Sequence, residues 1–385
     1  MAGFKVQVFW QAGAPSVVPE CLKFTGGKLR FLQFSPPMQS ASTILRRLCL
    51  LILLAVNLIP VHADDADPKP SVDILPKVHG VIRPRWEMDT KGGESRFQLR
   101  DARVTLNGNL SPAIDYFFQT NFCDRGKVLF LDGWGRIAFT PALKLQAGQF
   151  RLPYGTDCFR APLNYFFANR SFIGGTMNNV RGVGAKLSYD FNLPAGSTLL
   201  VEAGAFNPTV MAEQNIWVKT LAYAGKAVYN IGNVHLSAGA ETLIPDSIRI
   251  NSFTGSATWT RGGWTVEGEY ITKHYIHDAY KTAHGYNFFA NYAFPVKAGV
   301  FNEASVQARF DGMTAYSNGT RNKEGRLTTT NPARNRVTVG ATLTYRYKAV
   351  HCDLRLDYEK YFYHHDAVVA VGAGDKICAE MVIRF

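Results

Sequence analysis

The sequence predicts an all-β fold, namely a transmembrane antiparallel β-barrel of about sixteen strands with one long loop that folds inward. Three observations support this prediction. Apolar and polar residues alternate in segments of roughly ten residues along most of the chain. The connections between these segments are alternately short and long. A short apolar run near the N-terminus has the form of an export signal.

The export signal comes first in the chain. Arg46 and Arg47 precede an apolar run of signal-peptide length, and Ala63 ends a plausible cleavage site. The run is shorter than the about 20 apolar residues of a membrane-spanning helix, so a helix in a soluble core is the alternative. Because a signal belongs at the N-terminus, we expect translation to start at Met38 and residues 1–37 to be an upstream extension. The expected organisation is a signal peptide over 38–63, a short periplasmic segment over 64–76 and the barrel over 77–385.

Strand signals then continue to the last residue. Over 303–311, apolar residues such as Phe310 alternate with polar residues such as Arg309. The segments 336–346 and 353–359 follow the same pattern. Since side chains alternate across a strand, each segment has one apolar and one polar face.

The connections fall into two classes. If the first strand starts from the periplasm, every second connection should be a short turn, and the others should be external loops. The short set is predicted at 110–112, 140–142, 192–196, 230–233, 261–263 and 348–350, with a longer member at 294–302. The two longest connections, 153–181 and 313–335, fall in the opposite set. This sorting predicts that both ends of the barrel domain lie on the periplasmic side.

A large soluble β-sandwich is the alternative fold, because alternation also arises when the apolar face points inward. The 26 Phe, 17 Tyr and 6 Trp favour the barrel, since many flank strand ends as in an aromatic girdle. A closed barrel also leaves no strand edge, which a membrane requires. No segment of sufficient length remains for a plug domain, and this argues against an energy-coupled transporter.

Several function classes are disfavoured by composition. The net charge of the whole chain is +12. Residues 1–63 hold six basic residues and one acidic residue, so residues 64–385 carry a net charge of +7. No basic run suggests nucleic-acid binding. The histidines have no accompanying acid or cysteine in a metal-ligand pattern, so no metal or other cofactor is expected. A disulfide between Cys123 and Cys158, both in predicted loops, is possible in an oxidising envelope.

Arginines are the candidate pore-lining residues, because cationic rings favour anions in a water-filled pore. Four lie on predicted lumen faces of early strands, and Arg151 follows a predicted bulge near 147–149. Three more lie in the loop 153–181, which carries one acid, Asp157. Acids on the same faces leave open that these arginines only brace the wall. The candidates are Arg83, Arg85, Arg103, Arg136, Arg151, Arg160, Arg170 and Arg181.

Short motifs in the barrel region resemble one known family. The segment GQFRLPYG at 148–155 is similar to a motif of the phosphate-selective porin O and P family, where it precedes a long inward-folding loop. FANRS at 167–171 and RGVG at 181–184 resemble later family motifs, although Asn169 and Gly182 stand where the family commonly has an acid. GEY at 268–270, ARFD at 308–311 and LDYE at 356–359 continue the likeness, and the terminal Phe385 resembles a barrel-assembly signal.

The resemblance spans most of 77–385 and implies a sixteen-stranded homotrimeric porin in the outer membrane of a Gram-negative bacterium. The expected partners are outer-membrane lipid, small anions such as phosphate, and the barrel-assembly machinery. We therefore expect passive diffusion of small hydrophilic solutes with a preference for anions, and no enzymatic activity. A non-selective porin and a closed structural or adhesive barrel are the alternatives. A lipid hydrolase is disfavoured, because no Ser or Cys nucleophile is predicted beside a His on the outer face.

Overall fold

The computed structural model describes residues 74–124, 126–178, 180–208, 217–363 and 372–385. The predicted upstream extension, the signal peptide and residues 64–73 lie outside these ranges. The barrel falls in one compact unit, Pro70–Phe385. Within the described ranges, no helix combines the length and the hydropathy needed to cross a membrane.

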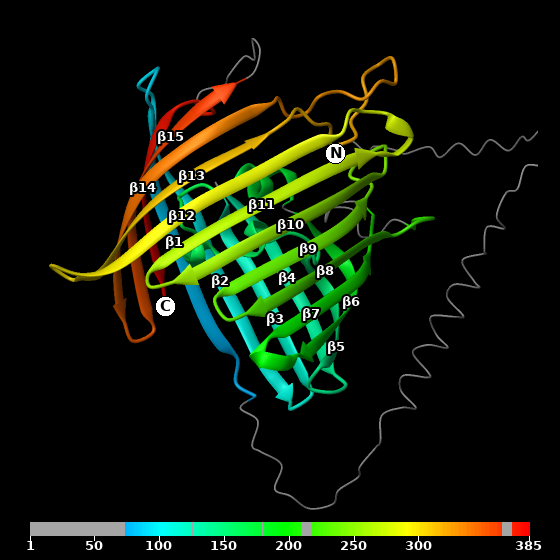
Figure 1. The fold of residues 1–385 in the computed structure, drawn as a ribbon, viewed down its shortest axis with the longest axis horizontal. Helices are drawn as coiled ribbons and strands as arrows, with labels where there is room; N and C mark the ends of the chain where they lie inside the picture. Colours follow the sequence, from blue (N-terminus) through cyan, green and yellow to red (C-terminus); the bar gives the residue numbers. More distant parts are fainter. Residues whose placement is uncertain (1–73, 125, 179, 209–216, 364–371) are drawn as a thin grey trace, which may run out of the picture. The chain divides into compact units, whose positions relative to one another are not determined.

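Sixteen antiparallel strands form one closed barrel, as the sequence predicts (Figure 1). Each strand pairs with its neighbours in the chain, and β1 closes the barrel by pairing with β16. The strands are β1 (Lys77–Asp89), β2 (Ser95–Ser111), β3 (Ile114–Asp124), β4 (Lys127–Ala138), β5 (Leu143–Arg151), β6 (Arg181–Asn192), β7 (Thr198–Phe206), β8 (Ala222–Ile231), β9 (Val234–Leu243), β10 (Ile250–Arg261), β11 (Trp264–Tyr275), β12 (Ala283–Ala298), β13 (Phe301–Met313), β14 (Arg334–Tyr347), β15 (Val350–Tyr363) and β16 (Lys376–Arg384).

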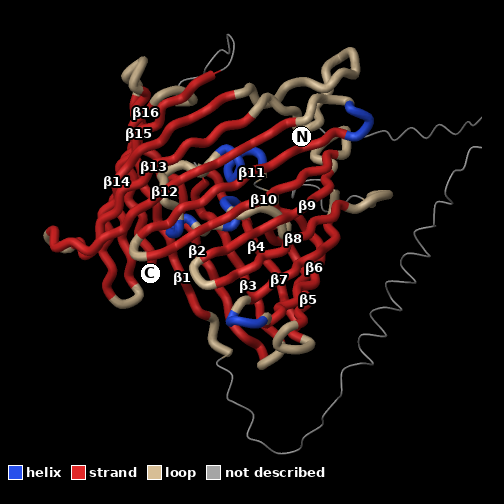
Figure 2. Tube along the Cα trace, in the orientation of Figure 1, coloured by secondary structure: helices blue, strands red, loops and turns tan. Residues whose placement is uncertain are grey.

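Helical segments are short and lie in the connections (Figure 2). Three of them belong to the long connection between β5 and β6. The described helical segments are the 3-10 helices η1 (Asp157–Phe159), η2 (Pro162–Asn164), η4 (Pro194–Gly196) and η5 (Ile276–Asp278), and the π-helix η3 (Ile173–Met177).

Short turns gather at one end of the barrel, called here the turn end, and the longest connections gather at the loop end. Gly262 and Gly263 join β10 to β11 with φ of 57° and 86°, the two positive values that a tight hairpin turn needs. The longer connection predicted at 294–302 is wrong, because β12 runs to Ala298 and β13 starts at Phe301. An irregularity in the pairing after Pro295 lets both strands extend beyond the proline, which cannot donate a ladder hydrogen bond.

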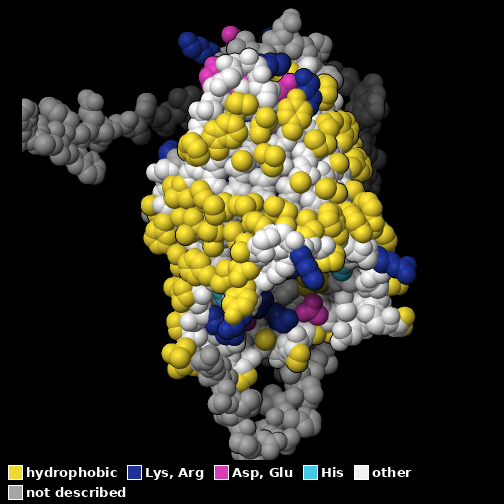
Figure 3. All heavy atoms as spheres, turned by 90° about the vertical axis from the view of Figure 1, so that its left-hand side faces the viewer, with side chains coloured by type: hydrophobic (Ala, Val, Ile, Leu, Met, Phe, Trp, Pro, Cys, Tyr) yellow, Lys and Arg dark blue, Asp and Glu magenta, His cyan; other side chains and the backbone are white. Residues whose placement is uncertain are grey.

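The alternating pattern has its apolar face outward. Phe310 and Leu356 are 44% and 56% exposed, whereas their neighbours Asp311 and Asp357 are fully buried. Apolar side chains form a broad band over the face in Figure 3. A sandwich requires the opposite arrangement, so this inversion excludes it and matches a barrel whose outer face meets lipid.

Several irregularities in the pairing alter this alternation, and two of them are bulges that change which side chains face the interior of the barrel. The ladder between β1 and β2 skips Arg100, and the ladder between β3 and β4 skips Leu131. The bulge predicted near 147–149 does not occur, because β5 pairs without a shift with both neighbours. Instead Gly148 takes a φ of 134°, and a Cβ there would lie 2.3 Å from the Gly133 carbonyl oxygen. A glycine therefore allows the close approach of β4 and β5 without an inserted residue.

The cysteines differ from the prediction. All four cysteines in the described part of the chain are free thiols. Cys123 lies within β3 rather than in a loop, and its thiol donates to the Leu99 carbonyl at 3.4 Å. Cys158 is buried and donates to the Tyr154 carbonyl at 3.2 Å. Each thiol thus has a separate backbone partner, and the disulfide considered between them is not formed.

Candidate functional site

The connection from β5 to β6, residues 152–180 and called here the inner loop, folds into the barrel as predicted. Its backbone carbonyls are bound by arginines of the barrel wall. Arg83 and Arg85 both donate to the Ala168 carbonyl, at 3.1 and 2.7 Å. Arg309, Arg336 and Arg355 donate to three further loop carbonyls, those of Asn169, Arg170 and Tyr165, at 2.8, 2.7 and 2.6 Å.

Carboxylates of the wall bind the amide groups of the same loop. Asp357 accepts from the Ala168 amide at 2.6 Å, and Asp311 accepts from the Phe172 amide at 2.8 Å. Glu269 accepts from the amides of Thr156 and Asp157 at 2.7 and 2.9 Å. Backbone polar groups inside a barrel need such partners, because burial without a hydrogen bond costs about 1–3 kcal/mol. The wall therefore supplies donors and acceptors in a pattern that fits one loop conformation.

Asp157 organises the start of the loop. It accepts hydrogen bonds from Arg160 at 2.6 Å and from the Ser171 hydroxyl at 2.7 Å. Burial opposes its charge, but the Arg160 guanidinium and the Ser171 hydroxyl outweigh burial and hold the pKa of the Asp157 carboxyl below its ordinary value. Arg160 also pairs with Glu267 of β11, so this arginine links the loop to the wall.

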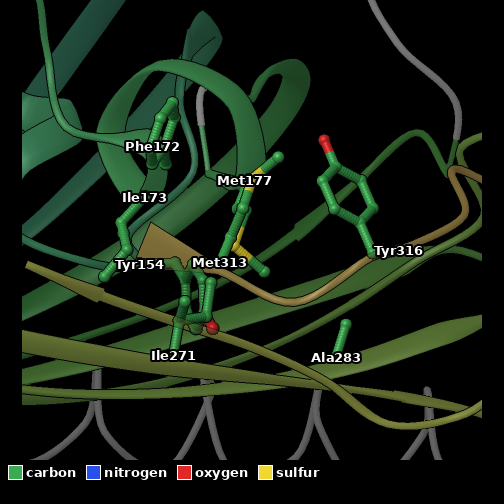
Figure 4. Packing of buried hydrophobic residues seen from close by; sticks show 8 residues of the cluster. All are labelled: Tyr154, Phe172, Ile173, Met177, Ile271, Ala283, Met313 and Tyr316. Atoms are coloured by element: carbon green, nitrogen blue, oxygen red, sulfur yellow. The ribbon is translucent and has the colours of Figure 1, made fainter. Parts of the chain in front are cut away.

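An apolar cluster packs the inner loop against the barrel wall (Figure 4). Tyr154, Ile173 and Met177 of the loop pack with Ile271 of β11 and Met313 of β13, and all five are almost fully buried. The cluster also contains Tyr316, whose hydroxyl donates to the Thr176 carbonyl at 2.9 Å. The connection between β13 and β14 therefore touches the inner loop from the loop end.

Aromatic residues of the inner loop pack on the barrel wall. Phe166 and Phe167 contact Phe289 of β12, with ring centroids 4.8 and 5.9 Å apart. Phe172 meets Tyr361 of β15 at 6.2 Å. Polar bonds and aromatic packing together hold the loop across the lumen.

A cavity of about 640 Å³, called here the lumen cavity, lies between the inner loop and the wall formed by β1 to β6 and β14 to β16. Among the described residues, its lining holds eight cations and two carboxylates. The cations are Arg83, Arg100, Arg103, Arg151, Arg170, Arg181, Arg336 and Lys376, and the carboxylates are Asp101 and Asp124. The lining also includes the apolar or aromatic side chains of Leu129, Leu131, Tyr165, Phe172 and Tyr361.

The cationic lining arises because several partner acids lie behind it. Arg181 forms two hydrogen bonds of 3.0 Å with Asp132, which is not part of the lining. Arg336 is bound by Asp311 at 2.8 Å and by Glu359 at 3.1 Å, and neither carboxylate lines the cavity. A solute in the cavity therefore meets guanidinium groups before it meets their counter-ions.

Five of the eight predicted arginines line this cavity: Arg83, Arg103, Arg151, Arg170 and Arg181. Among them, Arg83 is almost fully buried between Asp101 and Glu380, at 2.6 Å from each. Arg170 donates to the carbonyls of Cys158 and Arg160 within its own loop. These two arginines therefore also have a bracing role.

Three predicted arginines lie outside the lining. Arg85 is buried and pairs with Glu87 at 3.0 Å and Glu380 at 2.8 Å. Arg160 lies against the wall, as described above. Arg136 pairs with Asp115 at 3.0 Å and lies over the Trp134 ring toward the turn end of the lumen.

Three cations of the lining were missed by sequence reasoning. Arg100 is the bulged residue of β2, and alternation by itself cannot reveal a bulge. Arg336 and Lys376 lie on lumen faces that the period-two pattern of β14 and β16 shows. The alternation over 336–346 already places Arg336 on a polar face. Both residues would have joined the candidates if cations had been sought on the C-terminal strands as well, because β16 lies beside β1 in the closed barrel.

Solved structures of bacterial outer-membrane proteins share this architecture. An anion-selective porin from Comamonas acidovorans aligns with a TM-score of 0.55 at 13% identity, over 80% of this chain and 98% of that chain. OmpF of Salmonella typhi, solved with daunomycin, aligns with a TM-score of 0.55 at 12% identity, over 80% and 97%. The outer-membrane channel DcaP of Acinetobacter baumannii aligns with a TM-score of 0.53 at 10% identity, over 80% and 97%.

No protein-family model and no curated protein sequence matches the chain. The resemblance to the phosphate-selective porin O and P family stays a prediction from short motifs. The closed sixteen-stranded barrel, its inward loop and the aligned structures together show that the chain has the fold of the bacterial outer-membrane porins.

Proposed function

We propose that the protein is an outer-membrane porin through which small hydrophilic solutes diffuse passively, with a preference for anions. The single observation that supports this most is the lining of the lumen cavity, where eight cations face two carboxylates among the described residues. A pore selects by its radius and by its lining charges, so a cationic constriction raises the local concentration of anions.

Fixed geometry strengthens this effect. Arg100 pairs with Asp124, and Arg103 pairs with Asp101 at 2.8 Å, so both guanidinium groups are held in place while keeping partial exposure to the cavity. An anion that passes meets donors already oriented, and their reorganisation cost is small. Because low-dielectric walls focus field lines in a narrow lumen, these charges act more strongly there than on an open surface.

The finer features of the proposal follow from the sequence. The apolar run before Ala63 would direct export, and the terminal Phe385 would direct assembly into the outer membrane with its lipid. We include phosphate among the expected anions because of the motifs at 148–155 and 167–171. A homotrimer is proposed by analogy with porin folds, for which a trimer form of Vibrio cholerae OmpT is a solved example.

Planar-bilayer recording of the purified protein tests the proposal. In a salt gradient, the reversal potential should show anion preference, and added phosphate should reduce the chloride current. Open channels without ion preference would show that the protein is a general porin and that the arginines only brace the barrel wall. Absence of channels would favour a closed structural barrel.

A further inference from the structure

Two backbone bulges direct side chains into the same cavity. Arg100 is the extra residue of β2 and Leu131 is the extra residue of β4, and both line the lumen cavity. A bulge redirects a side chain away from regular alternation, and bulges are frequent beside functional sites. The two irregularities therefore add one guanidinium group and one apolar side chain to the same wall.

The apolar surface continues along β4. Leu129 lines the cavity and pairs with Asn121, which in turn pairs with Arg103, so the three residues lie on one row across β4, β3 and β2. On the other side of the leucines lies Arg181 of β6, which binds Asp132. Leu129 and Leu131 thus stand between two groups of cavity-lining arginines, one on β2 and one on β5 and β6.

The inner loop presents aromatic rings to the same cavity. Tyr165 lies beneath the guanidinium groups of Arg83 and Arg170, at 4.9 and 4.8 Å from its ring centroid. Phe172 and Tyr361 complete the aromatic part of the lining. A cavity of about 640 Å³ falls within the range of small-molecule sites, about 300–1,000 Å³. Apolar surface and guanidinium groups therefore alternate around a space that fits a small organic molecule.

We propose that the lumen cavity preferentially binds organic carboxylates with an apolar body, such as aromatic monocarboxylates, over small inorganic anions. This inference rests on the proposed anion preference and adds the substrate class. Guanidinium groups match the planar carboxylate with paired hydrogen bonds. The leucines and aromatic rings withdraw the apolar body from water, whereas a small hydrated anion gains nothing from them.

A homologous series of carboxylates tests the inference on the wild-type protein. Acetate, butanoate, hexanoate and benzoate are added separately to open channels in chloride, and the concentration that halves the current is measured. We expect this concentration to fall about twofold with each added methylene, and at most about fourfold if the methylene is fully buried. Equal values across the series would overturn the inference.

Paired substitutions on β4 locate the effect. In Leu129→Ser/Leu131→Ser, the dependence on chain length should disappear while the reversal potential in chloride is retained. The matched variant Leu129→Ile/Leu131→Ile keeps the apolar surface and should keep the dependence. If the serine double variant does not fold, Leu129→Ser, at the less buried leucine, should reduce the dependence at least partly. Unchanged dependence in a folded serine variant contradicts the role of these leucines.

The two proposals fail differently. If the wild-type channel shows no anion preference in chloride, the proposed function fails whatever the carboxylates do. If anion preference is present but benzoate blocks no better than acetate, only the substrate class fails. The reversal potential and the blocking series therefore separate the outcomes.

Discussion

Arg336 Nη2 donates a 2.7 Å hydrogen bond to the backbone carbonyl of Arg170, so an arginine of the barrel wall holds the backbone of an arginine in the inner loop. The same guanidinium group is bound by Asp311 and Glu359, and its side chain is almost fully buried. One residue therefore joins the wall network to the loop that crosses the lumen.

Replacing Arg336 with Ala should release part of the inner loop. Two buried carboxylates would lose their main partner, and breaking a buried pair typically costs about 3–5 kcal/mol. We expect a lower melting temperature and larger current fluctuations in single-channel recordings. Arg346→Ala is the matched control, because Arg346 pairs with Glu303 on the exposed surface, where a pair contributes about 0–1 kcal/mol. Equal behaviour of the two variants would refute the anchoring role.

Replacing Asp157 with Asn should loosen the start of the inner loop. The charged hydrogen bonds to Arg160 and Ser171 would be weakened, at about 1.5–3 kcal/mol for a bond to a charged group. Proteolysis of the folded protein within 152–180, followed by mass spectrometry, reports the change. Asp278→Asn, in a surface connection, serves as control and should leave the cleavage rate unchanged.

Acid should have the same effect as the Asp157 substitution. The folded pKa of this carboxyl is below the unfolded value of about 3.9, so its stabilisation is complete above that value. It is lost as the pH falls through the folded pKa. We therefore expect the difference in current fluctuation between the wild type and Asp157→Asn to stay constant between pH 7 and pH 5 and to shrink only below about pH 4. A difference that shrinks already between pH 7 and pH 5 would contradict the lowered pKa of Asp157.

The thiol of Cys158 should be unreactive while the loop is packed. Burial, reinforced by the negative charge of Glu269, raises the pKa of this thiol to about 12, and thiolate is the reactive form. Maleimide at pH 8 should therefore label the less buried Cys123 before Cys158. Peptide mapping after timed labelling measures the order. Rapid labelling of Cys158 in the folded wild type would show that the inner loop is not closed.

Replacing Arg100 with Gln should weaken the anion preference. Loss of one charge at about 7 Å from a permeating ion shifts the energies of an anion and of a cation by about 0.6 kcal/mol each in water, in opposite directions, so the anion-to-cation ratio should fall by at most about sevenfold. Arg136→Gln is the control, since Arg136 pairs with Asp115 outside the cavity lining and should have a smaller effect. Reversal potentials in a salt gradient measure both. A larger shift of the reversal potential for Arg136→Gln than for Arg100→Gln would show that the selective region lies nearer the turn end.

Much of the barrel could be predicted from the sequence. Period-two alternation and the sorting of short and long connections led to sixteen strands and to the position of the inner loop, and the structure confirms both. These features are readable because each depends on residues adjacent in the chain. The same local reading located the arginine-bearing segments, including Arg103 and Arg181, which line the cavity.

The roles of individual side chains depended on the tertiary structure. Arg83 and Arg85 are two residues apart on one lumen face, yet only Arg83 lines the cavity, while Arg85 is bound by Glu380 of β16 and by Asn169 of the loop. Arg100 and Leu131 reach the lumen through bulges, which the residue pattern does not reveal.

What the sequence by itself determined was therefore the alternation, the strand count and the position of the arginine-bearing segments, because these arise from local periodicity. Only the tertiary structure decided which arginines brace the inner loop and which line the cavity. The physical reason is that each guanidinium group is held by carboxylates and carbonyls from strands and loops distant in the chain, as in the contact of Arg336 with Asp311 and Arg170. Such partners come together only when the barrel closes and the loop lies inside it.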